Sequence, residues 1–318
     1  MNIPKIVIRR DEMIDTVKDA IGESNLYVEP YGIYSNNEVS DYRVKGGDRV
    51  NYHIHRYGYE LFTILSGSVE CALGGKRCMA YPGDMILVRP FVPHAFIYRE
   101  DHTVWQEIVV ALSLYENERS FGRLVQNCPE KIADRDFMAA YQAHNGRTDY
   151  YDIPAMEAEE ISAAAMPFLV RKADCYKSYK LPGIQMRLKF GRWDLGGLKE
   201  LWEFEMEKGF TMRTDFVYSP DEFIVKNGSV RVEVQNIAPQ IARTGDVIHI
   251  PNYTQHSITA LEEGTVLHDC NCQMHLLMMM EEYALNSANA PSLVNNREYL
   301  EGLMKKYDCP ITWAGVLA

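Results

Sequence analysis

The chain has 318 residues, of which 47% are hydrophobic and 24% are charged, a composition that excludes a wholly disordered protein. The length suits about two domains. The net charge of −11 disfavours a non-specific nucleic-acid binder, and no apolar run reaches the roughly 18 residues of a membrane helix. The first residues, MNIPKIVIRRDEMID, lack the apolar core of a signal peptide. We therefore expect a cytoplasmic protein with neither a membrane nor a nucleic-acid partner.

Two stretches of the chain, 59–96 and 221–258, share one layout. Each runs through an acidic residue, an apolar strand, a Gly turn, a second strand, a Gly-Asp pair, another apolar strand, a Pro turn and a His. Gly67 corresponds to Gly228 at an offset of 161, and the two histidines correspond at an offset of 162. A nearly constant offset over such a length indicates a tandem duplication.

Within each copy, runs of Val, Ile, Leu, Phe and Tyr alternate with Gly, Pro, Asn and Asp, which predicts an all-β sandwich or barrel. Apolar residues at three- and four-residue steps predict helices over 114–125, 156–173, 275–286 and 296–307. We expect the methionines near the C-terminus to pack in a core or a subunit contact. The predicted organisation is an N-terminal barrel, a largely helical linker, a second barrel and a helical C-terminal segment, at 1–111, 112–175, 176–275 and 276–318.

The segment 47–67 carries the strongest chemical signal. His53 and His55 stand at i and i+2, so on a β-strand both side chains leave the same face. Glu60 follows after a four-residue linker and can point back at them from the next strand, and His94 arrives near the start of a later strand. Three imidazoles and one carboxylate inside a small barrel predict a site for one divalent transition metal with coordination positions left over.

This spacing resembles the first motif of the cupin superfamily, Gly-x5-His-x-His-x4-Glu-x6-Gly, whose fixed positions are all matched, by Gly47, His53, His55, Glu60 and Gly67. The resemblance implies a bicupin, that is, two tandem double-stranded β-helix (jelly-roll) barrels.

The second cupin motif, Gly-x5-Pro-x-Gly-x2-His-x3-Asn, matches at Gly83 and His94. The sequence departs from it at Arg89, Phe91 and Tyr98, where the motif has Pro, Gly and Asn. The metal ligand is retained, while the local turn and the pocket lining are put in doubt.

The second copy lacks most of the metal motif. Thr214 and Phe216 occupy the two histidine positions and Asp221 occupies the glutamate position, so that only Asp221 and His256 remain as candidate ligands. We therefore expect the second barrel to bind no metal and to serve as a structural partner, a subunit interface or a lid.

A rival cluster lies further along, where His268, Cys270 and Cys272 would share one face of a strand and could bind zinc. By the offset of 162 these positions correspond to an ordinary strand of the first copy. Small thiols often replace aliphatic core residues, and we expect the seven cysteines to be reduced.

Strand parity places further residues near the metal. Asn51 shares a face with the histidines, Phe62 shares one with Glu60, and Phe96 and Tyr98 follow His94 on its side. Tyr98, whose hydroxyl can donate to a metal-bound oxygen, is our candidate catalytic residue. Asn51, Phe62, Phe96 and Arg89 are candidate substrate-binding residues, Arg89 as a partner for an anion.

The barrel layout and ligands also resemble those of bicupin dioxygenases of the quercetin and gentisate type. This resemblance implies an iron(II) dioxygenase acting on a small aromatic or enolic substrate, although Mn, Ni, Cu or Zn could fill the same ligands. One alternative is a metal-dependent isomerase, decarboxylase or hydrolase of a small carbonyl compound. Another is a non-enzymatic sensor, because the segment from Tyr52 to Phe96 also resembles the effector-binding domain of AraC-type regulators. Bicupin enzymes are commonly homodimers, and we expect the same here.

Overall fold

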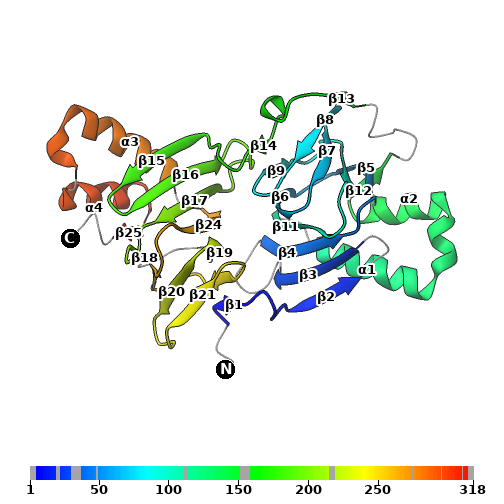
Figure 1. The fold of residues 1–318 in the computed structure, drawn as a ribbon, viewed down its shortest axis with the longest axis horizontal. Helices are drawn as coiled ribbons and strands as arrows, with labels where there is room; N and C mark the ends of the chain where they lie inside the picture. Colours follow the sequence, from blue (N-terminus) through cyan, green and yellow to red (C-terminus); the bar gives the residue numbers. More distant parts are fainter. Residues whose placement is uncertain are drawn as a thin grey trace. The chain divides into compact units, whose positions relative to one another are not determined.

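The structure is a computed structural model. It describes residues 5–18, 22–29, 37–47, 49–110, 114–150, 158–214, 219–273, 275–294, 296–309 and 311–313. The chain forms two compact units, one of Met13–Asp174 and one of Met1–Glu12 with Cys175–Ala318 (Figure 1). The short strand β1 (Val7–Ile8) pairs with a strand of the second unit, so residues 5–12 belong to that unit and not to the N-terminal barrel to which we assigned them.

The first unit consists of two sheets around an aromatic and aliphatic core (Figure 1). The six-stranded sheet has the order β12 (Arg147–Asp149), β5 (Arg49–His55), β10 (His94–Tyr98), β7 (Val69–Leu73), β8 (Lys76–Ala80) and β13 (Glu159–Glu160). The seven-stranded sheet has the order β14 (Leu169–Val170), β9 (Met85–Val88), β6 (Tyr59–Ser66), β11 (Thr103–Val110), β4 (Asn37–Val44), β3 (Gly22–Val28) and β2 (Asp15–Lys18).

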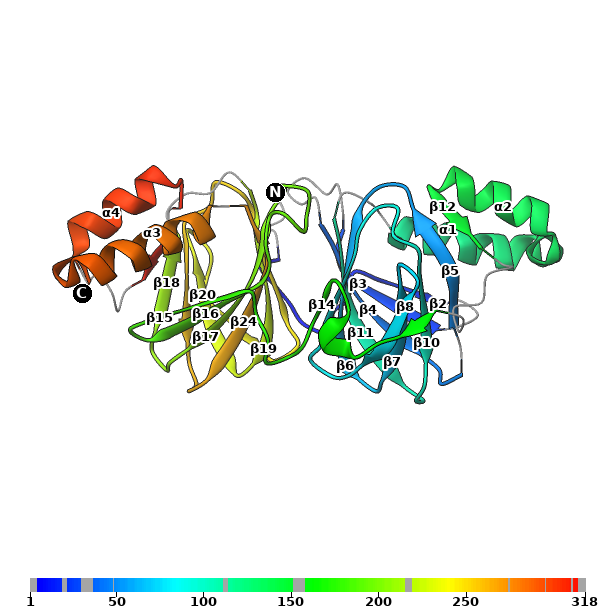
Figure 2. The ribbon, with the colours of Figure 1, turned by 90° about the horizontal axis from the view of Figure 1, so that it is seen from above.

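A helical hairpin lies at one end of this barrel, near β5 and β12 (Figure 2). It consists of α1 (Leu114–Asn127), the short helix η1 (Pro129–Ala133) and α2 (Arg135–His144). Asp134 caps α2 by accepting a hydrogen bond from the Phe137 backbone at 3.0 Å. The chain then enters β12, which pairs with the strand that carries His53 and His55. The hairpin is thereby attached to the edge of the predicted metal site.

The helix predicted over 156–173 is wrong where the structure describes it, from residue 158 onward. This segment forms β13, the short helix η3 (Ala163–Ala165) and β14, whose strands extend the two sheets of the first barrel. Arg77 holds it in place by donating to the Ala158 carbonyl at 3.1 Å and to Glu160 at 3.0 Å. Pro167 also interrupts the helical pattern. Sheet pairing overrides local propensity here.

The second unit repeats the two-sheet layout. One sheet has the order β1, β22 (Val247–Ile250), β19 (Asp221–Asn227), β24 (Thr265–Cys272), β17 (Glu200–Met206), β16 (Ile184–Phe190) and β15 (Lys177–Leu181). The other has the order β21 (Gln240–Arg243), β20 (Ser229–Val234), β23 (His256–Ala260), β18 (Thr211–Thr214) and β25 (Ile311–Trp313). Its hairpin consists of α3 (Leu276–Asn289), η4 (Pro291–Leu293) and α4 (Arg297–Lys306).

The duplication includes the helices. The helices α1 and α3 begin at residues 114 and 276, and α2 and α4 begin at 135 and 297, in both cases at an offset of 162. Asn296 caps α4 as Asp134 caps α2, and β25 pairs with β18 as β12 pairs with β5. The helical zones at 112–175 and 276–318 are therefore not a linker and a tail, because each contains the cover of the barrel before it.

One glycine occurs at the same place in both barrels, between β6 and β7 and between β19 and β20, and its presence has a steric cause. Gly67 and Gly228 have φ angles of +74° and +78°. A Cβ atom at these positions would lie only 2.4 Å from the Thr103 hydroxyl and 2.7 Å from the Thr265 hydroxyl. Only glycine fits this left-handed turn against the neighbouring strand, and both copies have retained it.

The all-β architecture with two tandem barrels is confirmed. The methionine run of α3 packs in the core of the second barrel, where Met279 and Met280 are each 1% exposed, while Met278 is 55% exposed. In the described residues, no helix is both long enough and apolar enough to cross a membrane.

Candidate metal centre and its cavity

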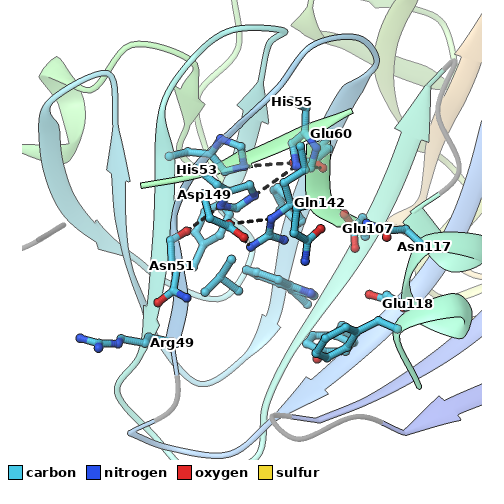
Figure 3. Close-up of a pocket in the computed structure, with 18 of the residues that line it drawn as sticks. Arg49, Asn51, His53, His55, Glu60, Glu107, Asn117, Glu118, Gln142 and Asp149 are labelled. Carbon is cyan, nitrogen blue, oxygen red and sulfur yellow. Dashed lines mark hydrogen bonds and ion pairs between the residues drawn. The ribbon is translucent and has the colours of Figure 1, made fainter. Parts of the chain in front are cut away.

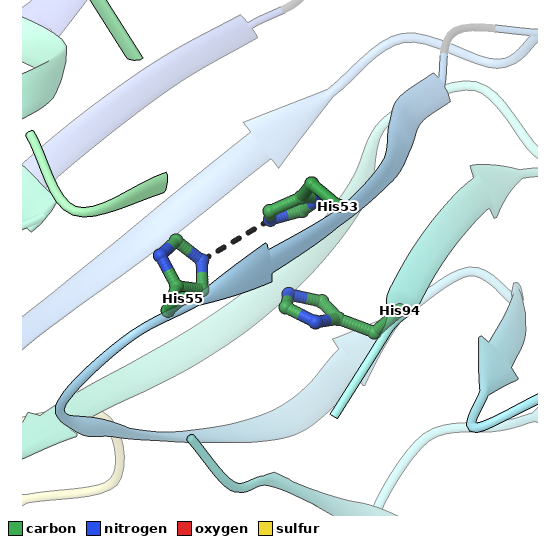
Figure 4. Close-up of side chains that lie close together, drawn as sticks. All are labelled: His53, His55 and His94. Atoms are coloured by element: carbon green, nitrogen blue, oxygen red, sulfur yellow. Dashed lines mark hydrogen bonds between the residues drawn. The ribbon is translucent and has the colours of Figure 1, made fainter. Parts of the chain in front are cut away.

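Three imidazoles meet inside the first barrel. His53 and His55 come from β5, and His94, from β10, lies directly opposite His53 in the ladder between the two strands (Figure 4). The Nε2 atoms of His53 and His55 are 3.1 Å apart, and the rings of His53 and His94 have centroids 4.0 Å apart. All three side chains are buried, and their ligand atoms lie within 4.8 Å of one another.

Backbone carbonyls set the tautomers of two of these imidazoles. The Nδ1 of His53 donates to the Asn51 carbonyl at 2.6 Å, and the Nδ1 of His94 donates to the Val92 carbonyl at 2.9 Å. A carbonyl can only accept, so the lone pair of each ring is on Nε2, which faces the cluster. The Nε2 of His94 is buried and has no hydrogen-bond partner in the described part of the chain. The donor set therefore fits a bound metal ion.

Glu60 completes the cluster from β6. Its Oε1 lies 2.8 Å from the His55 Nε2, and its Oε2 lies 3.4 Å from the His94 Nε2. Burial acts to raise the pKa of Glu60, but the two imidazoles outweigh it and hold that pKa below its usual range. Burial lowers the pKa of His53, and the charge of Arg147 adds to the effect. A neutral imidazole and an ionised carboxylate are the forms that bind metals.

The turn that delivers His94 keeps its geometry without the glycine of the motif. Phe91 has a φ of +62°, and its backbone N–H donates to the His55 carbonyl at 2.8 Å. Tyr253, at the corresponding place in the second barrel, has a φ of +59°. Both rings are exposed, Phe91 by 65% and Tyr253 by 58%. The departure at Phe91 therefore leaves the left-handed turn in place.

A cavity of about 400 Å³ opens beside the imidazoles (Figure 3). One part of its lining is apolar, formed by Tyr42, Val50, Phe62, Phe96, Trp105, Phe121, Ile132 and Met138. The other part is polar and includes Arg49, Asn51, Glu107, Asn117, Glu118, Gln142, Arg147 and Asp149 together with the metal-site residues. The volume suits a small organic molecule.

The structure places three of the five predicted auxiliary residues at this cavity. Asn51, Phe62 and Phe96 line it. Tyr98 does not line it, because it lies four residues along β10 from His94, about 13 Å away, where its ring contacts Trp105 in the core. Arg89 does not line it either, since its guanidinium packs over the ring of Phe168 at 5.2 Å.

Sequence reasoning missed most of the polar lining. Asn117, Glu118 and Gln142 lie on the hairpin that we interpreted as a linker, and no pattern in the sequence pointed to them. Glu107 did leave a signal, since it is a carboxylate inside the apolar strand TVWQEIVV. A charged residue in a strand that is buried on both faces needs an explanation.

Glu107 is the most unusual group of the cavity. Its side chain is 4% exposed, and its Oε1 has no hydrogen-bond partner in the described part of the chain. Burial raises the pKa of Glu107 well above its usual range, and the nearby carboxyls of Glu60, Glu118 and Glu38 raise it further. These surroundings favour the protonated form of the carboxyl, which is the form that can donate a proton.

The second barrel brings together a much poorer set of ligands. The His256 Nε2 lies 3.2 Å from the Asp221 Oδ2, and Thr214 occupies the position of His53. Phe216 lies outside the described residues. Among the described residues, the imidazoles of the first barrel are the only group of three or more metal-binding side chains. The rival cluster of His268, Cys270 and Cys272 is therefore not assembled, and none of the seven cysteines forms a disulfide.

Comparisons with known proteins agree with this architecture. Residues 41–108 match the cupin domain family. The oxalate decarboxylase of Lactobacillus farciminis, solved as a formate complex, is similar with a TM-score of 0.57 and 13% identity, over 92% of this chain and 95% of that one. The oxalate decarboxylase of Bacillus subtilis at pH 4.6 is similar with a TM-score of 0.56 and 13% identity, over 98% and 88%. No curated protein matches the sequence.

The fold and the site together define the class of protein. The chain has the fold of a bicupin, and its residues 41–108 match the cupin domain family. The first barrel brings together three imidazoles that could hold a metal ion, and the described part of the second barrel contains no such group. The resemblance found in the sequence is thereby confirmed. At 13% identity, the structural likeness shows the fold alone.

Proposed function

We propose that this chain is a metal-dependent enzyme that transfers a proton on a small carbonyl or enolic substrate without oxidising it. The observation that supports this most is the position of Glu107, a buried and unpartnered carboxyl that lines the same cavity as His53, His55, Glu60 and His94. A site of this kind serves an isomerase or a decarboxylase, the alternative class that the sequence left open. The solved structures most similar in fold include enzymes named as decarboxylases.

The metal would be held by the three Nε2 atoms and the Glu60 carboxylate. This mixture of imidazole and carboxylate suits manganese or iron, and one similar solved structure concerns the Mn(II) centres of Bacillus subtilis oxalate decarboxylase. When bound, such an ion would act as a Lewis acid on a carbonyl or enolate oxygen.

The chain's own residues supply the rest of the chemistry. Phe62, Phe96 and Trp105 exclude water from one wall of the cavity and support a planar substrate. In a decarboxylation the C–C bond to the carboxylate breaks and CO₂ leaves, and in an isomerisation the proton that leaves the substrate carbon passes to solvent water. Glu107 then donates its proton to the carbon that is to be protonated: its O–H bond breaks, a C–H bond forms, and its carboxylate regains a proton from solvent. Placing such an acid correctly contributes about 10²- to 10⁴-fold in rate.

Proton exchange between substrate and solvent tests this proposal. Protein loaded with manganese or iron is incubated in D₂O without oxygen, with pyruvate, oxaloacetate and phenylpyruvate as probes, and NMR follows both deuterium incorporation and decarboxylation. We expect turnover without oxygen, a loss of at least about 100-fold in Glu107→Gln, and unchanged metal content in that variant. Asp269→Asn, which alters the corresponding carboxyl of the second barrel, is the matched control and should keep wild-type rates.

Full activity of Glu107→Gln, or turnover of none of the probes, would contradict the proposal. Oxygen consumption with these substrates would instead favour the iron(II) dioxygenase predicted from the sequence. That second candidate is favoured by one observation: the tilted and edge-to-face cluster of Phe62, Phe96 and Trp105, with ring centroids 4.5–4.9 Å apart, forms an aromatic wall beside the imidazoles.

A further inference from the structure

We infer that Arg147 forms a carboxylate-binding subsite beside the metal centre, so that the substrate is an organic acid with an apolar, planar body. This inference rests on the proposed function for the claim that the bound acid is the substrate. The subsite itself is argued from geometry and can be tested by binding alone.

Asp149 fixes the orientation of Arg147. The Nε and Nη2 of Arg147 both lie 2.8 Å from the Asp149 Oδ1, and the two side chains are 20% and 4% exposed. In the ladder between β12 and β5, Arg147 lies opposite His55 and Asp149 lies opposite His53. Arg147 thus lines the cavity from a position next to the strand that carries two of the imidazoles.

This ion pair leaves donors of Arg147 unused. Its Nη1 makes no hydrogen bond within the residues that the structure describes, although the side chain is largely buried. A guanidinium offers five N–H donors in a planar fork that matches a carboxylate. A cation oriented in this way and only partly paired is suited to bind an anionic ligand.

Two amides on the hairpin add to the same lining. The Oδ1 of Asn117 on α1 and the Oε1 of Gln142 on α2 are buried and lack hydrogen-bond partners in the described part of the chain. Leaving a buried polar group without a partner costs about 1–3 kcal/mol, so such groups are retained where a ligand completes them. Each amide can turn an N–H toward a ligand oxygen or accept from a ligand hydroxyl.

The second barrel supports treating these residues as one unit. At the offset of 162, Asn117, Glu118 and Gln142 are replaced by Met279, Met280 and Met304. Cys309 corresponds to Arg147, and Ile311 lies opposite Thr214 as Asp149 lies opposite His53. The copy that lacks two of the three imidazoles therefore also lacks the arginine, its aspartate and both amides. The ion pair is thus present in the barrel that assembles three imidazoles and has no counterpart at the corresponding positions of the other barrel.

The remaining lining indicates the rest of the ligand. Phe62, Phe96 and Trp105 form the aromatic wall, and Phe121 and Met138 add apolar surface from the hairpin. A cavity of about 400 Å³ is at the lower end of the range for small-molecule sites and has room for a ring or a short chain beyond the carboxylate. An aromatic or enolic acid fits both parts of the lining.

Matched pairs of acids and neutral amides test the subsite. Titration calorimetry measures the binding of 3-hydroxybenzoate, 3-hydroxybenzamide, phenylpyruvate and its amide to zinc-loaded wild-type protein. We expect each acid to bind at least about tenfold more tightly than its amide, which corresponds to 1.4 kcal/mol. In Arg147→Met this preference should fall to about onefold, and Arg147→Lys should keep part of it because the charge remains.

Arg171→Met is the matched control, since Arg171 also pairs with a buried aspartate of the first barrel, Asp84, but does not line the cavity. It should keep the full preference for acids, and circular dichroism checks that all three variants are folded. Equal binding of acids and amides, binding of neither, or an unchanged preference in Arg147→Met would overturn the subsite. A preference that requires Arg147 in a protein that exchanges no protons would preserve the subsite and reject the proposed reaction.

Discussion

The two barrels of this chain have the same fold, and each is covered by its own pair of helices, but their interiors differ. In the first barrel, α1 and α2 present Asn117, Glu118 and Gln142 to a cavity beside three imidazoles. In the second barrel, Met279 and Met280 on the corresponding helix α3 pack among Trp202, Phe204 and Phe223 in a continuous core. A cupin barrel closed by a helical hairpin can therefore be a site or a scaffold, and the side chains of the hairpin distinguish the two.

This difference has an energetic side. A buried methionine contributes to stability through burial of apolar surface and dispersion contacts, whereas an unpartnered buried amide or carboxyl lowers it. At the positions that face its hairpin, the second barrel has the composition of an apolar core. The first retains groups that cost stability, which natural proteins tolerate at functional sites.

Truncating Met279, which fills the core of the second barrel, should give the largest effect on stability. Met279→Ala opens a cavity in the second core, and we expect it to lower the free energy of unfolding by about 2–5 kcal/mol. Asn117→Ala alters the corresponding residue of the first barrel, which already faces a cavity, and should change stability by less than about 1 kcal/mol. Urea denaturation followed by fluorescence measures both. If both variants lost the same free energy of unfolding, the two barrels would not differ in packing as we describe.

Changing Asp269, the buried acid of the second barrel, should have a smaller effect on the free energy of unfolding, and this effect should depend on pH. Burial raises the pKa of Asp269 well above its usual range, and the charge of Asp221 raises it further. Below about pH 4, Asp269 is protonated in both folded and unfolded chains and has no effect. As the pH rises above this value, the unfolded chain loses its proton first, so the folded state loses stability up to the raised pKa.

Asp269→Asn removes this penalty. We expect the variant to be more stable than the wild type at pH 7.5 and to show no advantage at pH 4. Chemical denaturation at both values measures the difference. An advantage that is the same at pH 4 and pH 7.5 would show that ionisation of Asp269 is not its cause.

The fold and the convergence of the three imidazoles could be predicted from the sequence, because both depend on local patterns. Alternation of apolar residues identifies strands, and a spacing of i and i+2 brings His53 and His55 to one face of a strand. The repeat of Gly67 and His94 at Gly228 and His256 revealed the duplication.

The cover of the cavity depended on long-range contacts and could not be predicted. Nothing near Gln142 or Arg147 in the sequence indicates that a helical hairpin and the short strand β12 attach to β5. We placed Tyr98 at the site by strand parity, which predicts the face of a strand but not the distance along it, and Tyr98 does not line the cavity. The homodimer stays a prediction, and the burial of Met279 and Met280 in the second core removes part of its basis.

The central claim is that only the first barrel binds metal, and the metal content of the protein tests it most directly. Protein is purified without chelators, loaded with manganese or iron, dialysed and analysed by plasma mass spectrometry. We predict one ion per chain in the wild type, less than about a tenth of an ion in His53→Ala and in His94→Ala, and one ion in His256→Ala. Two ions per wild-type chain, with the second lost in His256→Ala, would contradict the assignment of the second barrel as a scaffold.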